Sequence, residues 1–353
     1  MNRLIEYLIR RLIFAAPTLL ILSLIIFSTM TFVPLDERVR LYKSEFKYRN
    51  PLHEVSDEVI IAKYHLNDSF IVQWATWLKE DLKGNLGFSR VMGVPVLEGM
   101  LLSFGATLEI VMYSAPLIVL IGYKVGVLSA KRAYKKTWGG DPVDKIVRVA
   151  STIAYSTPAF LLGLFLLLVF YLGLHWPSIR RLGLEAEFFV RSSCFTRYTG
   201  LYTVDALLNG QPWILFDALQ HLALPVLTLT ITISPIIIRI TRASMMEELN
   251  KPYVLLGRAK GLNEKQVVDH AKKPASFSIF TVSSIIVASM LTGVVVVEWI
   301  FQIHGLGYWL VKGATRWDYQ LIVGITLLFC LIYMIANIMV DIMYTYLDPR
   351  VKL

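Results

Sequence analysis

The chain has 353 residues, of which 56% are hydrophobic and only 17% are charged, and its formal net charge is +9. Soluble domains are usually about 45–50% apolar and about 25% charged, so this composition excludes a single water-soluble globule and a disordered chain. Cys194 and Cys330 are the two cysteines, too few for a disulfide framework. A nucleic-acid binder needs a polar basic surface that is scarce here, so the sequence predicts a membrane protein.

Long stretches without Asp, Glu, Lys or Arg predict helices that cross a membrane, because about 20 apolar residues span the bilayer core. Five stretches are free of these residues, and a sixth is interrupted only by Lys124. The six predicted spans are residues 12–35, 110–130, 149–179, 218–238, 274–297 and 319–340. The first is too long for the apolar core of a signal peptide and ends in no small-residue cleavage site, so we expect a retained helix.

The distribution of charge predicts an orientation, because cytoplasmic segments carry an excess of Lys and Arg. With the N-terminus inside, the inner segments hold 19 basic and 8 acidic residues, and the outer segments hold equal numbers of each. The inner segments are residues 1–11, 131–148, 239–273 and 346–353. We therefore expect a multi-pass protein of the cell membrane with both termini in the cytoplasm.

The outer segment after the first span, residues 36–96, contains its own structural signals. Ser56-Asp57-Glu58 is typical of a helix start, and Gly84-Asn85-Leu86-Gly87 indicates a turn. Between these two signals, Trp74 and Trp77 stand at helical spacing, and for them packing is favoured over stacking on a sugar. The sequence predicts a small ordered extracellular cap.

The third inner segment carries explicit helix boundaries. Pro252 is a favoured first helical residue, and Gly261 is typical of the left-handed residue that ends a helix. Asn263 and Gln266 form a predicted capping box, which starts the next helix. A short helix over residues 252–260 is therefore expected outside the bilayer on the cytoplasmic side.

This short helix is expected to expose an apolar surface that includes Tyr253, Val254 and Leu256, together with Arg258. Such a surface is typical of docking to a partner protein. An ordinary basic loop that rests on anionic lipid headgroups would also explain the lysines, although not the two caps. The residues alone leave both interpretations open.

Other ionisable residues near the spans give weaker signals. Glu109 is expected in the first turn of the second helix, Glu298 at the outer end of the fifth and Asp341 at the inner end of the sixth. Pairing or anchoring at a helix end is favoured over proton relay for each of them. His221 lacks neighbours at metal-ligand spacing, and neither a P-loop nor a hydrolase motif occurs in the sequence.

The stretch Tyr253-Val254-x-x-x-Arg258-Ala259-Lys260-Gly261-Leu262 resembles the coupling-loop signature of binding-protein-dependent ABC importer permeases, specifically the dipeptide and oligopeptide permease family. Other stretches resemble the same family in the same order. They are Gly84–Ser89, Ser156–Phe160, His221–Pro225, Val296–Phe301, Gly305–Gly307, Asp318-Tyr319 and Asp341–Arg350. The family usually continues this loop as Arg-Asn-Ala-Leu-Leu-Pro, whereas Pro274 comes earlier here, so the start of the fifth helix stays open.

The resemblance implies an all-α membrane protein with six transmembrane helices, the type I ABC importer permease fold, and the cap between helices 1 and 2. Its implied parts are the first helix (1–35), the cap (36–96), a permease core (97–345) with a coupling loop (241–274), and a tail (346–353). The implied contacts with the ATPase lie within 252–262, at Tyr253, Val254, Gly257, Arg258, Ala259, Lys260, Gly261 and Leu262.

The implied partners are a second, similar permease, two ABC ATPase subunits on the cytoplasmic side and an extracellular substrate-binding protein, all in a lipid bilayer and without nucleic acid. The chain itself would hold no cofactor, and ATP and Mg²⁺ would bind in the ATPase subunits. The imported solute would be an oligopeptide or, as an alternative, an oligosaccharide. An ion-coupled secondary transporter is the alternative from another class, and a membrane-embedded enzyme is a third.

Overall fold

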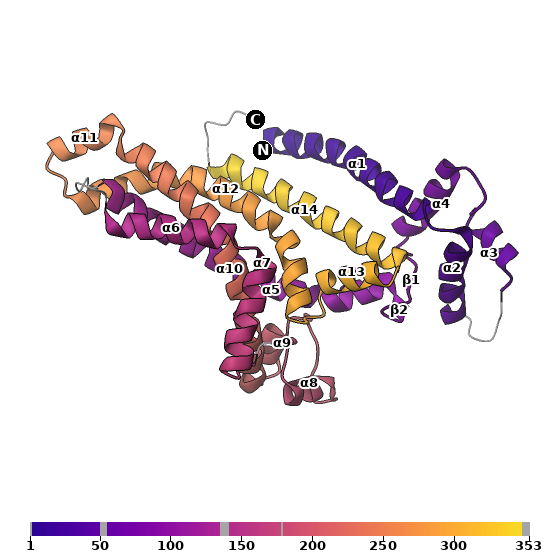
Figure 1. Ribbon diagram of the computed structural model, residues 1–353. Coiled ribbons are helices and arrows are strands. Elements are labelled where there is room, and N and C mark those ends of the chain that lie inside the picture. Colours follow the sequence, from indigo (N-terminus) through magenta and orange to yellow (C-terminus); the bar gives the residue numbers. More distant parts are fainter. Residues whose placement is uncertain (1, 50–54, 135–140, 178, 348–353) are drawn as a thin grey trace. The chain divides into compact units, whose positions relative to one another are not determined.

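The computed structural model describes residues 2–49, 55–134, 141–177 and 179–347, and it is almost entirely helical (Figure 1). The helices are α1 (Asn2–Thr31), α2 (Leu35–Arg49), α3 (Asp57–Lys63), α4 (Phe70–Leu82), α5 (Val96–Tyr134), α6 (Pro142–Ser156), α7 (Ala159–Leu166), the π-helix η1 (Leu167–Gly173), α8 (Leu184–Arg191), α9 (Tyr202–Leu208), α10 (Pro212–Leu249), α11 (Pro252–Ala259), α12 (Glu264–Ile300), α13 (Leu306–Thr315) and α14 (Tyr319–Leu347). Two short strands, β1 (Phe88–Ser89) and β2 (Val94–Pro95), pair antiparallel.

The chain forms two compact units. The first is built around Met1–Thr107 and His304–Ile338, and the second around Leu108–Ile303. The backbone passes from the first unit to the second within α5.

The predicted cap segment belongs to the first unit and contains α2, α3, α4 and the strand pair. Ser56 precedes α3, which confirms the helix start predicted there. Trp77 stacks on Phe27 of α1 with ring centroids 5.2 Å apart, and the indole N–H of Trp74 donates to the Ser23 hydroxyl at 3.2 Å. The packing role expected for these two tryptophans is therefore confirmed.

Asp318 joins the strand pair to the start of α14 inside the first unit. Its buried carboxylate accepts hydrogen bonds from the Ser89 hydroxyl at 2.7 Å and from the Val91 N–H at 3.0 Å. The Gln320 side chain accepts a further bond from the Phe88 N–H at 2.9 Å. Two stretches that lie far apart in the sequence are thereby fixed to each other.

Within the described residues, three helices are long and apolar enough to cross a membrane by themselves: Val96–Tyr134, Pro212–Leu249 and Tyr319–Met339. Three bent helix pairs raise the number to six if each pair is counted as one span. Helices of membrane-spanning length and composition are thus present, and the count of six stays a prediction.

Two of the predicted spans differ from the structure in shape. The span expected over residues 149–179 is interrupted, since α6 and α7 meet at 99° around Thr157-Pro158. A proline disfavours helical geometry in the residue before it, which explains the break. The span expected over residues 274–297 is the later part of α12, which begins at Glu264 directly after the predicted capping box and bends by 51° between Ser276 and Ile279.

Two glycines of α5 permit close packing on α10 within the second unit. A Cβ atom on Gly122 would lie 2.5 Å from the Ile237 side chain, and one on Gly126 would lie 2.5 Å from that of Thr241. Only glycine allows the backbones to approach this closely at a four-residue spacing. α10 itself contains two internal prolines, Pro225 and Pro235.

Candidate functional site

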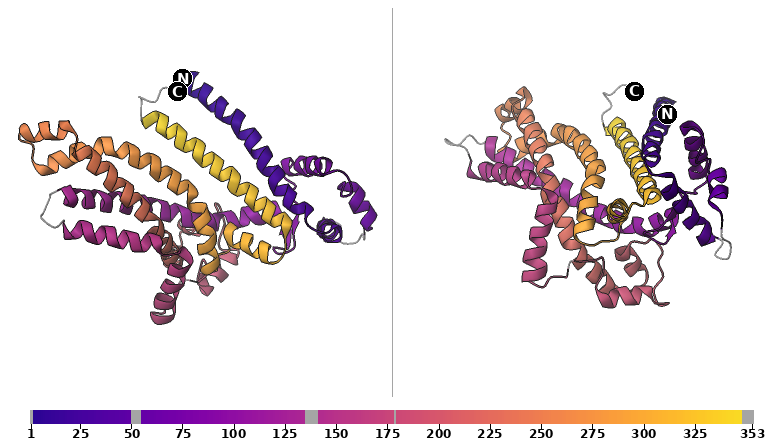
Figure 2. Two further views of the ribbon diagram at one scale, coloured as in Figure 1. Left: turned by 45° about the horizontal axis from the view of Figure 1, so that its top comes forward. Right: turned by 45° about the vertical axis from the view of Figure 1, so that its right-hand side comes forward.

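The short helix α11 lies at the tip of the hairpin formed by α10 and α12, as both views of Figure 2 show. Pro252 is its first residue, preceded by Lys251 in an extended conformation. Gly261 follows the helix with φ of +83°, and the Leu262 N–H donates to the Gly257 carbonyl at 3.1 Å. This is the hydrogen bond of a glycine-based helix C-terminus, so the predicted boundaries of the short helix are confirmed.

The connection from α11 to α12 is also the predicted one. The Asn263 side chain accepts a hydrogen bond from the Gln266 N–H at 2.9 Å, and the Gln266 side chain accepts one from the Asn263 N–H at 3.0 Å. These two bonds satisfy backbone donors that a helix start otherwise leaves open. α11 is therefore bounded by defined turns on both sides.

The exposed surface of α11 differs from the predicted one at one residue. Val254 was expected on the exposed surface, but only 2% of it is accessible, because α11 packs against α12 and turns this side chain inward. Tyr253 is 39% exposed, and Leu255 and Leu256 are exposed further. Ala259, Lys260 and Gly261 are also accessible. The apolar surface exists, with Leu255 in the place predicted for Val254.

Arg258 is held by contacts within the chain. Its guanidinium donates two hydrogen bonds of 3.0 Å to the Glu264 carboxylate, one to each oxygen, and one of 2.8 Å to the Tyr134 hydroxyl. It also lies over the Tyr134 ring, 4.8 Å from the centroid. Arg258 therefore ties α11 to the first turn of α12 and to the end of α5.

Tyr253 is fixed at the other end of α11. Its hydroxyl donates to the Glu248 carboxylate at 2.9 Å, and Glu248 also pairs with Lys251. Partial burial and the adjacent Glu248 carboxylate raise the pKa of Tyr253 to about 12, so the hydroxyl keeps its proton at neutral pH.

The end of α10 that leads to α11 is joined to α6 by an ion pair. Arg242 donates to both oxygens of Asp144 at 2.7 and 3.0 Å, and the Ser129 hydroxyl donates to the same carboxylate at 2.6 Å. Asp144 is buried, and a two-pronged arginine contact fixes geometry as well as charge. Helices α5, α6 and α10 are thus connected close to α11.

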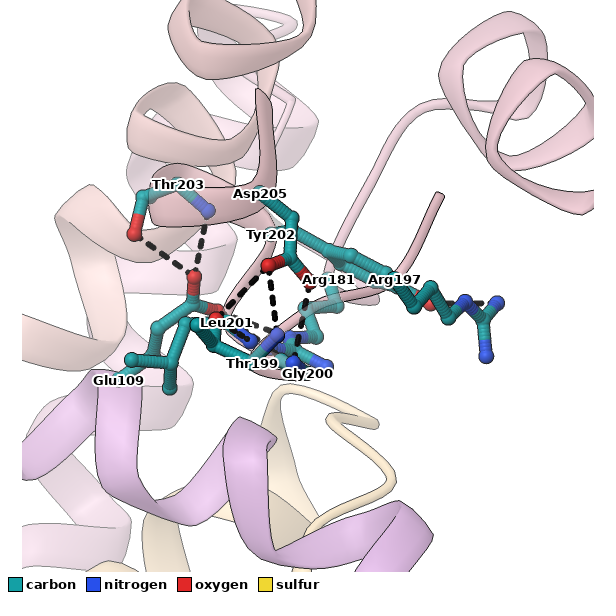
Figure 3. Close-up of polar contacts among 9 residues, drawn as sticks. All are labelled: Glu109, Arg181, Arg197, Thr199, Gly200, Leu201, Tyr202, Thr203 and Asp205. Atoms are coloured by element: carbon teal, nitrogen blue, oxygen red, sulfur yellow. Dashed lines mark hydrogen bonds and ion pairs between the residues drawn. The ribbon is translucent and has the colours of Figure 1, made fainter. Parts of the chain in front are cut away.

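Glu109 lies in a buried polar cluster (Figure 3), and its predicted place in a helix is wrong. α5 starts at Val96, so Glu109 lies in the helix interior and not in the first turn. Its carboxylate pairs with Arg181 at 2.8 Å and accepts from the N–H and hydroxyl of Thr203 at 2.7 and 2.8 Å. The pairing role preferred for it is confirmed, and its cation, Arg181, comes from the segment between η1 and α8.

The same cluster orders the segment that leads into α9. Arg181 also donates to the Gly200 carbonyl at 2.6 Å and lies over the Tyr202 ring at 4.0 Å. Asp205 accepts from the N–H and hydroxyl of Thr199 at 2.8 Å, as Figure 3 shows. The chain segment between α8 and α10 is therefore held against α5 by charge-assisted hydrogen bonds to Glu109.

The remaining ionisable candidates lie as follows. Glu298 is buried in the last turn of α12. His221 is buried inside α10, where its Nδ1 lies 2.8 Å from the Asp217 carbonyl one turn earlier. The side chain of Asp341 and most of the predicted tail lie outside the described residues.

Sequence reasoning missed several residues of this region. The side chains of Tyr253 and Arg258 are held by Tyr134, Glu248 and Glu264. Of these three, only Glu264 carried a signal in the sequence, as an acidic residue in the first turn of a helix. The pair Gly122-x-x-x-Gly126 also carried a signal, since two small residues four apart in an apolar helix are typical of close helix packing.

Comparisons with known proteins agree on one family. The family described as "Binding-protein-dependent transport system inner membrane component" matches residues 122–353, which include α11 and both flanking helices. The probable D,D-dipeptide transport system permease protein DdpB of Escherichia coli (strain K12) is 34% identical over 298 residues, 83% of this chain and 84% of that protein. The oligopeptide transport system permease protein AppB of Bacillus subtilis (strain 168) is 30% identical over 349 residues, 98% and 99% of the two chains. The dipeptide transport system permease protein DppB of Escherichia coli (strain K12) is 28% identical over 350 residues, 99% of each.

Proposed function

Because this chain belongs to the family of binding-protein-dependent transport system inner membrane components, we propose that it forms half of the pathway of an ATP-driven importer and couples to ATPase subunits through residues 252–262. The chain is a membrane permease subunit. The proposed arrangement has six spans, both termini in the cytoplasm and residues 36–96 as an extracellular cap. The excess of Lys and Arg in the inner segments supports this orientation.

The observation that supports the coupling role most directly is the rigid attachment of α11. Turns of defined geometry bound it on both sides, and Arg258 and Tyr253 fix it to α12, α5 and α10. A rigid element that joins two membrane-length helices transmits a displacement to both of them. The accessible residues Tyr253, Leu255, Leu256, Ala259, Lys260 and Gly261 then form the surface that enters the groove of the ATPase.

The energy for transport comes, in this proposal, from the partner subunits. The sequence contains no Gly-Lys dipeptide, which a phosphate-binding loop requires, so ATP and Mg²⁺ are assigned to two ATPase subunits. A second, similar permease completes the pathway, and an extracellular binding protein delivers the solute.

The proposed solute is a short peptide. The relatives named above are described as D,D-dipeptide, oligopeptide and dipeptide permeases, and they align over most of this chain. Oligosaccharide import by the same machinery is the alternative. Binding of peptide and glycan panels to the partner receptor separates them, and glycan binding without peptide binding would overturn the choice of peptide.

A matched pair of glycine substitutions tests the coupling role. Gly261 and Gly210 both have positive φ, and neither has a heavy atom within 4 Å of the position of a Cβ, so Gly261→Val and Gly210→Val impose the same kind of backbone strain. We expect Gly261→Val to lose co-purified ATPase and transport-coupled hydrolysis, and Gly210→Val to keep both. Equal behaviour of the two variants contradicts the role.

A second variant avoids the backbone. Ala259→Glu adds bulk and charge to an exposed position of α11 without changing its turns. In the purified complex, the expected result is a reduced yield of bound ATPase with an unchanged melting temperature of the permease. ATPase retained at the wild-type ratio would exclude Ala259 from the contact.

A further inference from the structure

A cleft of about 350 Å³ lies between the ends of α5 and α12 that are nearest to α11, and four lysines line it. Lys124 and Lys131 come from α5, and Lys265 and Lys272 come from α12. The only acidic residue in the lining is Asp269, and the remaining lining residues are Tyr123, Val127, Leu128 and Val268. None of the proposed transport steps uses this cleft.

The spacing of the four lysines along their helices places each pair on one side of its helix. Each pair is separated by seven residues, which is close to two helical turns, so both members lie on one face of their helix about 10 Å apart. Val127 and Val268 lie between the members of each pair and are buried. Two basic rows thus face each other across an apolar floor.

The cleft carries an excess of positive charge. Lys272 pairs with Asp269 at 2.7 Å, and Lys131 and Lys265 are close enough to act electrostatically on the same carboxylate. One carboxylate against four ammonium groups leaves a formal charge of +3. A concave site with several cations and a single anion favours an anionic ligand with more than one acceptor oxygen.

The surroundings of Lys124 indicate where that ligand comes from. This lysine lies in the apolar run of residues 110–130, and side chains on the same stretch of α5 are exposed. They are Leu117, Leu120, Ile121 and Leu128, between 37% and 48% accessible. An exposed apolar helix face in a membrane protein contacts acyl chains, and Tyr123 is of the type that lies at the headgroup level.

We infer that the cleft lined by Lys124, Lys131, Lys265 and Lys272 binds the phosphate headgroup of an anionic phospholipid, with the acyl chains along the exposed apolar face of α5. Basic pockets between membrane helices on the cytoplasmic side bind such headgroups. A soluble ATPase does not reach Lys124, because that side chain starts inside the apolar run. The cleft therefore fits a lipid better than it fits an acidic protein surface.

This inference rests on the membrane location of α5 and α12 and is independent of the coupling role of α11. The test uses the purified complex in nanodiscs made of equal parts phosphatidylglycerol and phosphatidylcholine. After transfer to detergent, native mass spectrometry counts the phospholipids that stay bound. The test variant is Lys124→Gln with Lys265→Gln.

A matched control removes the same charge from neighbouring positions. The control variant is Arg132→Gln with Lys273→Gln. Arg132 and Lys273 are the sequence neighbours of Lys131 and Lys272, but they do not line the cleft themselves. We expect the wild type and the control to retain phosphatidylglycerol in preference to phosphatidylcholine. The test variant should lose this preference by about 25-fold, since each basic side chain near an anionic lipid contributes about a factor of five.

Three results would overturn the inference. The first is equal loss of phosphatidylglycerol in the control, which would show a diffuse charge effect. The second is displacement of the lipid by inorganic phosphate at millimolar concentration, which would assign the cleft to a soluble anion. The third is unchanged lipid retention together with loss of ATPase in the test variant, which would assign the lysines to a protein contact.

Discussion

The hydroxyl of Ser89 donates a hydrogen bond of 2.7 Å to the carboxylate of Asp318, which lies 229 positions later in the chain. Both residues are completely buried, and the same carboxylate accepts from the Val91 N–H. The strand pair β1–β2 is therefore attached to the start of α14 by charge-assisted bonds, each stronger than a neutral one.

Asp318→Ala should release the strand pair, because the Ser89 hydroxyl and the Val91 N–H lose their acceptor. We expect a cost of about 3 kcal/mol in the stability of the first unit. Trypsin cleavage after Arg90, which is exposed beside the strand pair, should become faster in the purified protein. Asp68→Ala, which removes an exposed aspartate of the same unit, should leave this rate unchanged, and an unchanged rate in Asp318→Ala would refute the attachment.

Arg181→Met should destabilise the second unit strongly. It leaves the fully buried Glu109 carboxylate without its cation, and breaking a buried pair in this way costs about 3–5 kcal/mol. The double variant Glu109→Gln with Arg181→Met should recover part of the loss, because no buried charge remains. Thermal unfolding in detergent measures both, and a double variant less stable than Arg181→Met contradicts the ion pair.

Gly126→Ala should weaken the packing of α5 on α10. The added methyl group would lie 2.5 Å from the Thr241 Cβ and 2.9 Å from the Ile238 carbonyl, and neither of these can move easily. Overpacking of this kind costs about 1–3 kcal/mol. Gly163→Ala is the control, since its methyl group meets side chains at 3.4 Å, an ordinary contact. Equal melting temperatures for the two variants would exclude the close approach.

Asp81 should make the cap segment less stable as the pH rises. Neither of its buried carboxylate oxygens has a hydrogen-bond partner in the described part of the chain, and burial raises the pKa of Asp81 to about 7 from an ordinary value of 3.8. The folded state therefore holds the proton more tightly than the unfolded state. Stability falls between pH values of about 4 and about 7 and is level above that range.

Asp81→Asn should remove this slope and raise stability at neutral pH by a few kcal/mol at most. The measurement is thermal unfolding at a series of pH values. Glu58→Gln, which neutralises an exposed carboxylate of α3, should keep the slope. A slope that survives in Asp81→Asn would assign the pH dependence to another group.

The boundaries of α11 could be predicted because they depend on neighbouring residues. Pro252, Gly261, Asn263 and Gln266 each act within one turn of the backbone, and each has the predicted local role. The side of α11 that faces solvent could not be predicted in the same way. Val254 is buried, and α11 packs against α12, which is a tertiary contact between separate helices.

Glu109 shows the other limit of sequence reasoning. A span counted from the absence of charge starts directly after a charged residue, here Glu109. Helix α5, however, starts at Val96, more than three turns before Glu109. The cation that pairs with Glu109 is Arg181, from the segment between η1 and α8, and its hydrogen-bond donor is Thr203, at the start of α9. Their contact depends on the tertiary fold.

The two prolines inside α10 have a mechanical consequence. Each removes one backbone hydrogen bond, so the helix is least stiff around Pro225 and Pro235, while the Asp144–Arg242 pair holds the end near α11. A force applied at α11 therefore reaches α10 at the end that the Asp144–Arg242 pair fixes. The more flexible part of α10 lies further away, around the two prolines. We therefore expect α10 to bend around its prolines before the hydrogen bonds of Tyr253 and Arg258 break.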